Sequence, residues 1–339
     1  MALPRFALAN KILIEDMLGM KRDDRMLITS SPQTPYDVVE SVMSYAESVG
    51  VKSQVLIAHE ASREPMTAVT SFAREFNGIY SMGIYSLFDT KDVIEAGGKC
   101  LFVGEGPGID ESLIRTIADV DVFKLRDEAW KITEAFDNGS TLKITSKQGS
   151  DFTLDIRGAL GYPTHGFASD PKGCPIDFEP PATPGVDAQP ALKNKAYGKI
   201  AFDAYLSGVG VLREPVVATF EKGQIAKVEG GVQAEQFWEK IKEWPEKYHA
   251  EIEVGTNPNA LLVAPNGRIL QEWERVRGAV HIGIGDWMPY PVYRESKLIN
   301  PGWKPARHHC DGMLWAPTVT IDDNIIVKDG IIRHPYALL

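Results

Sequence analysis

The stretch DRMLITSSPQTPYDVVESVMSYAESVGVKSQVLIAHE, residues 24–60, predicts the fold class of the first third of the chain. Residues 24–31 form a short apolar run typical of a buried strand, and residues 52–60 form a second one. Between them, residues 36–50 carry apolar side chains at helical spacing and end at Gly50, a residue common just past a helix. A strand, a helix and a strand in this order predict a parallel pair.

The same alternation continues on both sides of this stretch. The apolar spacing predicts helices over 7–20, 66–76 and 109–120, and a third strand over 99–106. The glycines of GEGPG, 104–108, do not meet the spacing of a dinucleotide-binding fingerprint, because residue 109 is isoleucine, so we interpret them as a strand-to-helix turn. We expect residues 1–128 to form an α/β domain with a mostly parallel sheet and helices on both faces.

Beyond about residue 125 the pattern becomes rich in strands. One helix is predicted over 126–139, a hairpin around the Gln-Gly turn of STLKITSKQGSDFTLDIRG, and a second helix over 234–244. Strand-like runs cover 198–206, 215–229, 259–265, 279–285 and 317–330. Prolines cluster between 163 and 190, which we interpret as an ordered loop region near a site. We expect residues 129–339 to form an α+β, metal-binding catalytic domain.

Composition excludes several classes of protein. The chain has 339 residues, with a formal net charge of -10, which argues against a nucleic-acid partner. Acidic residues interrupt the N-terminal segment, so it does not read as a signal peptide, and no apolar run is long enough to span a bilayer. The three cysteines, Cys100, Cys174 and Cys310, are widely spaced, which suits a reducing compartment. We therefore expect a cytoplasmic protein with no membrane partner.

The segment RHHCDGM, 307–313, gathers groups that bind transition metals. In an extended segment, His309 and Asp311 share one face, while His308 and Cys310 share the other. An imidazole and a carboxylate at this spacing are suitable ligands for Zn²⁺, Mn²⁺, Co²⁺ or Fe²⁺. The alternatives are a zinc site built on His308 and Cys310, and a polar turn in which His309 and Asp311 form a hydrogen bond.

Three further segments contain candidate ligands. His281 lies inside an apolar strand between glycines, where it is either a core residue or a ligand that a close backbone approach permits. Glu251 and Glu253 share one face of a strand, which is either solvated or ligand-bearing. Glu179 precedes two prolines in a stiff segment, and alone it would be an ordinary surface residue.

Together these segments resemble the metal-site pattern of the M29 aminopeptidases, the aminopeptidase T type. A strand glutamate with Gly-x-Asn-Pro, then Val-His-Ile-x-x-Gly, then His-x-Asp follow one another in that family's order, about thirty residues apart. The resemblance covers most of the C-terminal two thirds. It implies that Glu251, His281, His309 and Asp311 bind metal, and that Glu179, followed by Thr183-Pro184, matches the family's first metal glutamate. Tyr290, next to Pro291, is the nearest match to a tyrosine-proline pair of the family, although it lies about two residues too far along.

The resemblance extends to a branch with different chemistry, the 2,5-dihydroxypyridine 5,6-dioxygenases. These share the His-x-Asp pair, and are similar to this chain in length and in the QGSDFTL hairpin. In that branch the position matching Glu251 is a histidine, the position matching His281 is apolar and the first glutamate is absent, which leaves a mononuclear iron site. The present sequence departs from this pattern at all three positions.

These departures favour an aminopeptidase-like metallohydrolase that cleaves an amide or related C–N bond with a metal-activated water. Three carboxylates among five ligands favour two divalent ions, such as zinc, manganese or cobalt, over one. Glu274 or Glu253 is the candidate general base, and Tyr290 the candidate oxyanion donor. The alternative is a mononuclear Fe(II) dioxygenase that opens a hydroxylated pyridine-type ring, and a metal-free binding module is a third possibility. We expect a small-molecule or peptide substrate and a homo-oligomer, since the C-terminal region is rich in apolar and aromatic residues.

Overall fold

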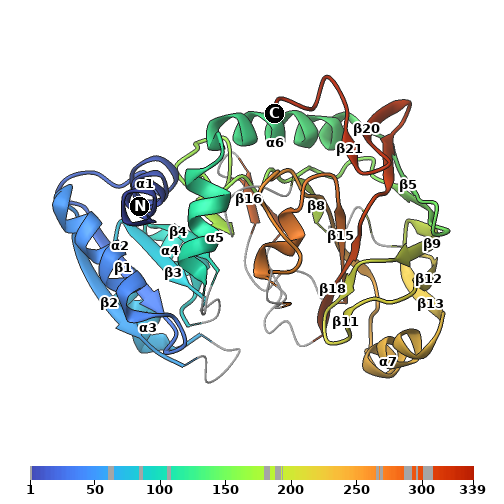
Figure 1. Ribbon diagram of the computed structural model, residues 1–339, viewed down its shortest axis with the longest axis horizontal. Helices are drawn as coiled ribbons and strands as arrows, with labels where there is room; N and C mark the ends of the chain where they lie inside the picture. Colours follow the sequence, from blue (N-terminus) through green and yellow to red (C-terminus); the bar gives the residue numbers. More distant parts are fainter. Residues whose placement is uncertain are drawn as a thin grey trace.

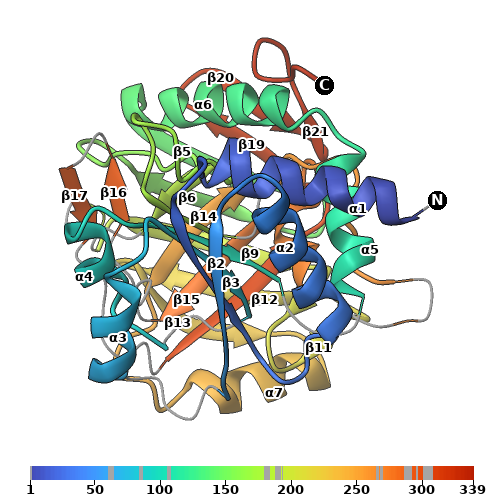
Figure 2. The same ribbon diagram turned by 90° about the vertical axis from the view of Figure 1, so that its left-hand side faces the viewer.

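The structure is a computed structural model, and it describes residues 2–59, 65–83, 87–104, 108–178, 184–187, 192, 194–264, 267, 270–285, 292–294, 297–300 and 308–339. In its N-terminal half, five strands form a sheet in the order β2–β1–β3–β4–β7 (Figure 1 and Figure 2). Every neighbouring pair is parallel, which confirms the predicted α/β domain. The strands are β1 (Arg25–Ser30), β2 (Lys52–Ile57), β3 (Gly78–Met82), β4 (Lys99–Val103) and β7 (Ile176–Phe178).

Helices cover both faces of this sheet, because alternate side chains of its strands point to opposite sides. Met26 and Ile28 of β1 lie in one apolar core with α1, α2 and α5, whereas Leu27 lies in another with α3 and α4. The helices are α1 (Ala2–Lys11), η1 (Ile12–Met17), α2 (Tyr36–Ser48), α3 (Thr67–Ala73), α4 (Thr90–Glu95), α5 (Ile109–Leu113) and η2 (Ile114–Ala118).

Local patterns missed some of these elements. The helix predicted over 7–20 begins earlier, at Ala2, and changes at Ile12 into the π-helix η1. Strand β3 was not predicted, because all five of its residues are buried and it therefore shows no alternation of polar and apolar residues. Strand β7 was not predicted either; it lies inside the proline-rich stretch that we had interpreted as a loop.

The C-terminal half contains two antiparallel sheets that pack on each other (Figure 1). The six-stranded sheet has the order β11–β10–β18–β15–β14–β8, and the eight-stranded sheet has the order β13–β12–β9–β6–β5–β19–β20–β21. One apolar core joins their inner faces: Ile252, Ile282 and Cys310 belong to the first sheet, and Phe152 and Phe220 to the second. The outer face of the six-stranded sheet therefore points away from this core.

The strands of the six-stranded sheet are β8 (Gly185–Asp187), β10 (Tyr205–Leu206), β11 (Gly210–Val211), β14 (His249–Val254), β15 (Val280–Gly285) and β18 (His309–Leu314). Those of the eight-stranded sheet are β5 (Thr141–Thr145), β6 (Asp151–Asp155), β9 (Ala196–Phe202), β12 (Val216–Glu221), β13 (Gln224–Glu229), β19 (Thr318–Ile321), β20 (Asn324–Lys328) and β21 (Ile331–Ile332). The remaining elements are α6 (Val122–Asn138), α7 (Val232–Ile241), the 3-10 helix η4 (Gln271–Arg275), and the hairpin of β16 (Val292–Arg294) and β17 (Lys297–Asn300).

The predicted hairpin around the Gln-Gly turn is present as β5 and β6. The run 215–229 is also a hairpin, since Lys222 and Gly223 both adopt positive φ angles between β12 and β13. The prediction of a strand over 259–265 is wrong for residues 259–264, the part of this range that the structure describes. The side-chain amides of Asn257 and Asn259 donate instead to the carbonyls of Thr116 and Arg115, which ties this segment to η2.

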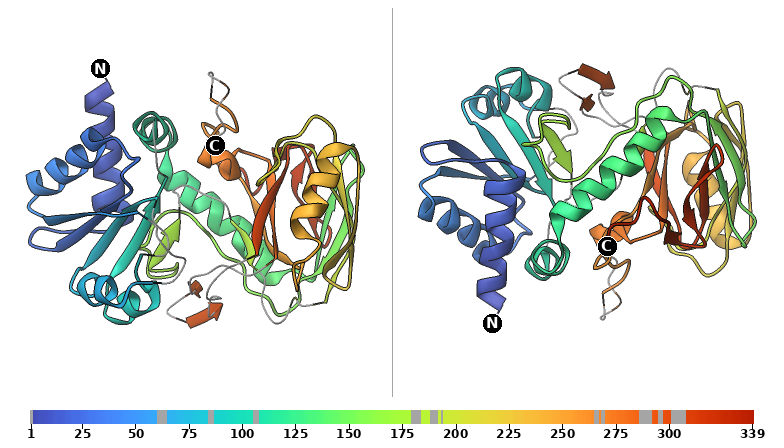
Figure 3. Two further views of the ribbon diagram at one scale, coloured as in Figure 1. Left: turned by 90° about the horizontal axis from the view of Figure 1, so that it is seen from below. Right: turned by 90° about the horizontal axis from the view of Figure 1, so that it is seen from above.

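Helix α6 runs between the two halves of the molecule (Figure 3). The boundary that we predicted after residue 128 falls inside this helix, and β7, from beyond it, joins the N-terminal sheet. Across the junction, the fully buried Glu128 accepts hydrogen bonds from Arg277 at 2.6 and 3.0 Å. The two halves thus share elements, and the division at residue 128 stays a prediction.

Candidate metal centre

Three neighbouring strands, β14, β15 and β18, carry the candidate ligands on the outer face of the six-stranded sheet. Glu251 lies opposite Gly283, which lies opposite Asp311, and Glu253 lies opposite His281. Directly opposite residues of antiparallel strands project to the same side, so these side chains share one face. Cys310 projects to the other side and packs in the core, as the alternation of an extended segment predicts.

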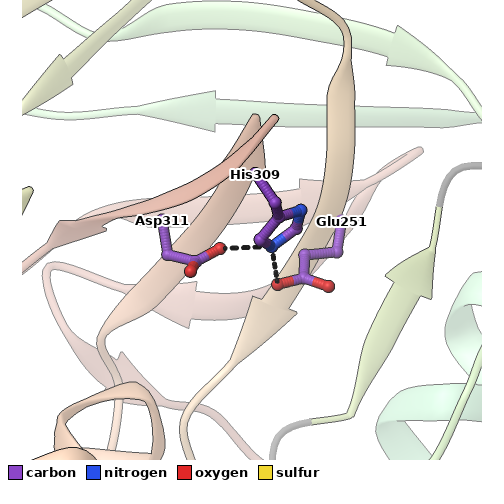
Figure 4. A group of neighbouring side chains, drawn as sticks. All are labelled: Glu251, His309 and Asp311. Atoms are coloured by element: carbon purple, nitrogen blue, oxygen red, sulfur yellow. Dashed lines mark ion pairs between the residues drawn. The ribbon is translucent and has the colours of Figure 1, made fainter. Parts of the chain in front are cut away.

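Glu251, His309 and Asp311 form the more open of two groups on this face (Figure 4). The His309 Nε2 atom lies 2.9 Å from Asp311 Oδ1 and 3.6 Å from Glu251 Oε1. The side chains of His309 and Asp311 are 22% and 16% exposed, whereas that of Glu251 is 7% exposed. The group is therefore accessible from the side of β18, where a small molecule could reach it.

Glu251, Glu253 and His281 form the second group, which is more deeply buried. The His281 Nε2 atom lies 3.2 Å from Glu251 Oε1 and 3.7 Å from Glu253 Oε2. Glu251 belongs to both groups, so its carboxylate lies between two sets of possible ligands. Glu253, which the sequence offered as a general base, thus lies among possible metal ligands.

The donor set fits a divalent ion. Neighbouring ligand atoms at about 2.1 Å from a shared metal lie roughly 3.0–3.4 Å from one another, close to the separations in the open group. Among the described residues, Glu251 Oε2 and His281 Nδ1 are buried without a hydrogen-bond partner. Buried polar atoms are costly to leave unsatisfied, so such atoms beside a cluster of ligands are what a metal site would contain.

Gly283 provides the space in which the carboxylates meet. A Cβ atom at this position would lie 2.7 Å from Cγ and 3.0 Å from Oε1 of Glu251. Any side chain larger than hydrogen would displace the Glu251 carboxylate. The glycine beside His281 therefore has the function that the sequence suggested, a close approach of backbone and ligand groups.

The charges of this cluster shift the pKa values of Glu251 and His309 in opposite directions. Burial on its own raises the pKa of Glu251, but His281 and His309 outweigh it and hold that pKa well below its usual range. Burial lowers the pKa of His309, but Asp311 and Glu251 reverse the effect and raise it well above 6.5. These shifts favour the ionised forms of Glu251 and His309; a divalent ion that binds His309 would replace its proton.

Glu274 reaches this face from the 3-10 helix η4. Burial, together with the charges of Asp311 and Glu251, raises the pKa of Glu274 well above its usual value. A carboxyl group with a raised pKa takes up a proton at a higher pH than an ordinary carboxyl group does. Glu274 can therefore exchange a proton with a bound molecule, in line with the predicted role as an acid or base.

Two aromatic residues beside the ligands were missed by the sequence analysis. Tyr205 of β10 lies opposite Met313 on β18, and its ring centroid is 4.8 Å from that of Trp273 in η4. Trp273 in turn contacts His281, with ring centroids 5.9 Å apart. Only the pairing of distant strands brings them together, so no local signal in the sequence could have found them.

The structure brings together six of the eight residues that the sequence singled out as ligand, base or oxyanion donor: Glu251, Glu253, His281, Glu274, His309 and Asp311. The other two, Glu179 and Tyr290, lie outside the described residues. That these residues bind metal stays a prediction.

Comparison with known proteins shows the family of this chain. The sequence model of the NicX family, 2,5-dihydroxypyridine 5,6-dioxygenase, matches residues 16–263, more than half of the chain. The chain belongs to the NicX family. No curated protein matches it significantly. Within the described part of the chain, no helix is long and apolar enough to cross a bilayer.

Two solved structures share the fold over nearly their whole length. The 2,5-dihydroxypyridine dioxygenase of Pseudomonas putida KT2440 has a TM-score of 0.77 and 17% identity, and the match covers 98% of this chain and 97% of that one. Wild-type AmpT of Thermus thermophilus has a TM-score of 0.63 and 13% identity, covering 97% and 99%. These likenesses confirm the fold and the resemblance to both the NicX and the aminopeptidase branches.

The NicX match corrects our preference between the two chemistries. The sequence patterns led us to favour an aminopeptidase-like hydrolase, whereas the family match favours the dioxygenase alternative. The matched residues end at 263, so they include Glu251 but not His281, His309 or Asp311. Our preference had relied on Glu251, His281 and Glu179, and only the first of these lies both in the matched range and in the described part of the structure.

Proposed function

We propose that this NicX-family protein is an Fe²⁺-dependent dioxygenase that opens a hydroxylated, pyridine-type ring. The observation that carries the proposal is the open group of Glu251, His309 and Asp311 on the exposed end of the sheet face. Three ligands on one side of an ion leave its other positions for a substrate oxygen and O₂. The family match supports the substrate class.

In this proposal the residues of the site have three roles: metal binding, orientation of a ligand and proton exchange. Glu251, His309 and Asp311 would hold the ion; bound Fe²⁺ would supply one-electron chemistry with O₂. His281 lies 3.2 Å from Glu251 Oε1 and fixes the direction of that carboxylate. Glu274, whose pKa is raised well above its usual value, would exchange a proton with the substrate.

The donor set differs from two histidines and one carboxylate, because Glu251 supplies a second carboxylate. Two carboxylates neutralise the charge of one Fe²⁺, so the ion would attract an anionic, deprotonated ring hydroxyl less strongly than in a site with one carboxylate. We expect the iron of this protein to bind its substrate more weakly for that reason, and to depend more on contacts from surrounding side chains.

A second candidate function is hydrolysis with two ions, and one observation favours it. Glu251 is shared by two ligand groups, since Glu253 and His281 form the second one behind it. A carboxylate that bridges two divalent ions is a recurrent feature of hydrolases that activate water between them. The second candidate function is therefore that of an aminopeptidase-like metallohydrolase with zinc, manganese or cobalt.

Oxygen consumption and metal content together test the proposal. Protein reconstituted with Fe²⁺ should consume one O₂ for each 2,5-dihydroxypyridine opened, should bind one ion per chain, and should be inactive under strict anaerobiosis. His309→Ala serves as the inactive control. Two ions per chain, with turnover of an amide substrate that persists without O₂, would transfer the assignment to the hydrolase.

A further inference from the structure

Tyr205 lies on the same face of the six-stranded sheet as the candidate ligands. It lies opposite Met313, Met313 lies opposite His281, and His281 lies opposite Glu253. These four residues form a row across β10, β18, β15 and β14, and their side chains project to one side. The neighbouring row contains Glu251, Gly283 and Asp311, so Tyr205 is at the edge of the metal centre nearest to β18.

Trp273 and Met313 hold the Tyr205 ring in place. The rings of Tyr205 and Trp273 are tilted by 54° with centroids 4.8 Å apart, and those of Trp273 and His281 are inclined by 73° with centroids 5.9 Å apart. Trp273 is only 6% exposed and Met313 is fully buried, whereas Tyr205 is partly exposed. Trp273 thus supports the tyrosine from behind, and Tyr205 is the aromatic residue of this pair that a ligand can reach.

The hydroxyl of Tyr205 lies near carboxyl groups of the site. The side chain of Ser207 hydrogen-bonds to Tyr205, and the charges of Asp311 and Glu274 act on the phenol. A phenol that accepts a hydrogen bond from Ser207 can still donate its own proton. Asp311 and Glu274 lie near it, so Tyr205 is an aromatic group beside carboxyl groups of this face.

We propose that Tyr205 is a substrate-binding residue of this site, whose ring packs against a flat, hydroxylated heteroaromatic ring and whose hydroxyl donates to an oxygen of that ring. A flat ring gains favourable offset or edge contacts from an aromatic partner that a rigid neighbour holds in position. The phenol proton favours ligands that carry a ring oxygen, because it can donate to that oxygen. The carboxylates of this face offer only acceptors and repel anions. This inference rests on the proposed function and names a residue that selects its substrate class.

Anaerobic binding of 2,5-dihydroxypyridine to the full-length, Co²⁺-loaded protein tests the inference. The variants are Tyr205→Phe, which removes the hydroxyl, Tyr205→Leu, which removes the ring, and Tyr197→Phe, a matched control at an exposed tyrosine of β9. In Tyr205→Phe, the loss of one neutral hydrogen bond should weaken the binding of 2,5-dihydroxypyridine roughly three- to tenfold. Tyr205→Leu loses the ring contact as well, so its binding of 2,5-dihydroxypyridine should be weaker still.

Two more measurements separate binding from structure. The Co²⁺ affinity, followed by visible absorption, should be the same in the wild type, Tyr205→Phe and Tyr197→Phe. With Fe²⁺ and O₂, Tyr205→Phe should raise KM more than it lowers kcat, because the lost contact exists before the reaction.

Each outcome separates the inference from the proposed function. If Tyr205→Phe binds 2,5-dihydroxypyridine as tightly as the wild type does, the inference is refuted while the proposed function stands. A fall in Co²⁺ affinity that parallels the loss of ring binding would make Tyr205 a support of the metal ligands instead. Absence of 2,5-dihydroxypyridine binding by the wild type at millimolar concentration would refute both.

Discussion

Glu251 and Asp311 lie in one row of the six-stranded sheet, separated only by the backbone of Gly283 on the strand between them. Strands two apart in a sheet are about 9–10 Å apart, so side chains must lean toward each other to share an ion. The missing side chain of Gly283 provides the room for this, because a Cβ there would lie 2.7 Å from Glu251 Cγ. The candidate metal centre therefore depends on a residue that has no ligand atom.

Gly283→Ala should weaken divalent-ion binding by about ten- to a hundredfold, the usual range when a neighbour of a ligand is changed. The methyl group displaces the Glu251 carboxylate, and the loss should be visible in a titration with Co²⁺. Ile282→Val, on the core face of the same strand, is the matched control. It should cost about 1 kcal/mol of stability and leave the metal affinity intact. Equal affinities for Gly283→Ala and the wild type would show that Glu251 tolerates the methyl group.

His309→Ala should abolish metal retention, whereas Cys310→Ser should leave it nearly intact. His309 lies in the ligand group, while Cys310 is 1% exposed and packs in the core on the other face of β18. Metal content after gel filtration, measured on both variants in parallel, checks the prediction. The reverse pattern, with metal lost only from the Cys310 variant, would place the site on the other face of the strand.

Local periodicity predicted the parts of this site that lie within one strand. The alternation of an extended segment was enough to separate His309 and Asp311 from Cys310, because the period of two is a property of any strand. It was also enough to place Glu251 and Glu253 on one face. Fold class followed in the same way from the alternation of strands and helices in the first third of the chain.

Register and packing between distant segments could not be predicted from these patterns. Whether Glu251 meets Asp311 depends on the alignment of β14, β15 and β18, which no single segment encodes. Tyr205 reaches the site only through the pairing of β10 with β18, and the resemblance to known families carried no tyrosine at this position. Segment 259–264 resembled a strand in its composition, but the side chains of Asn257 and Asn259 tie this segment to η2.

A second cluster of ionised groups, away from the metal centre, predicts a dependence of stability on pH. Partial burial acts to raise the pKa of Asp170, but hydrogen bonds from His165, the Lys172 N–H and Trp130 outweigh it and hold that pKa well below its usual range. A carboxyl group whose folded-state pKa is lowered stabilises the protein above its unfolded pKa of about 3.9. That contribution is lost as the pH falls through the lower, folded-state pKa.

Asp170→Asn should therefore destabilise the protein by about 1–2 kcal/mol at pH 6, allowing for the partial exposure of the carboxylate. The difference from the wild type should shrink below pH 4, because the carboxyl group of the unfolded wild type then gains a proton while that of the folded protein stays ionised to lower pH. Urea unfolding between pH 3 and pH 6.5 measures it, with the exposed Asp323→Asn as control. A difference that stays constant over this range would mean that the charge of Asp170 contributes nothing.

An ion pair between the two halves of the molecule holds the helix that carries Glu274 and Trp273. Arg115 of η2 contacts Glu272 of η4, whose side chain is 1% exposed and also accepts a hydrogen bond from Ser112 at 2.9 Å. The Arg115 Nε atom donates to the Asn259 carbonyl at 3.0 Å. The N-terminal half thereby fixes η4, and with it Glu274 and the aromatic support of the candidate site.

Arg115→Ala should destabilise the protein by about 3–5 kcal/mol, because it leaves the Glu272 carboxylate buried without its cation. The control is Arg25→Ala, whose ion pair with Glu75 is solvent-exposed and should contribute less than about 1 kcal/mol. Urea unfolding of both variants at neutral pH measures the difference. Because η4 also carries Glu274, turnover by the Fe²⁺-loaded Arg115 variant should fall as well, while Arg25→Ala keeps wild-type activity. Equal, small losses of stability in the two variants would show that η4 holds its position without Arg115.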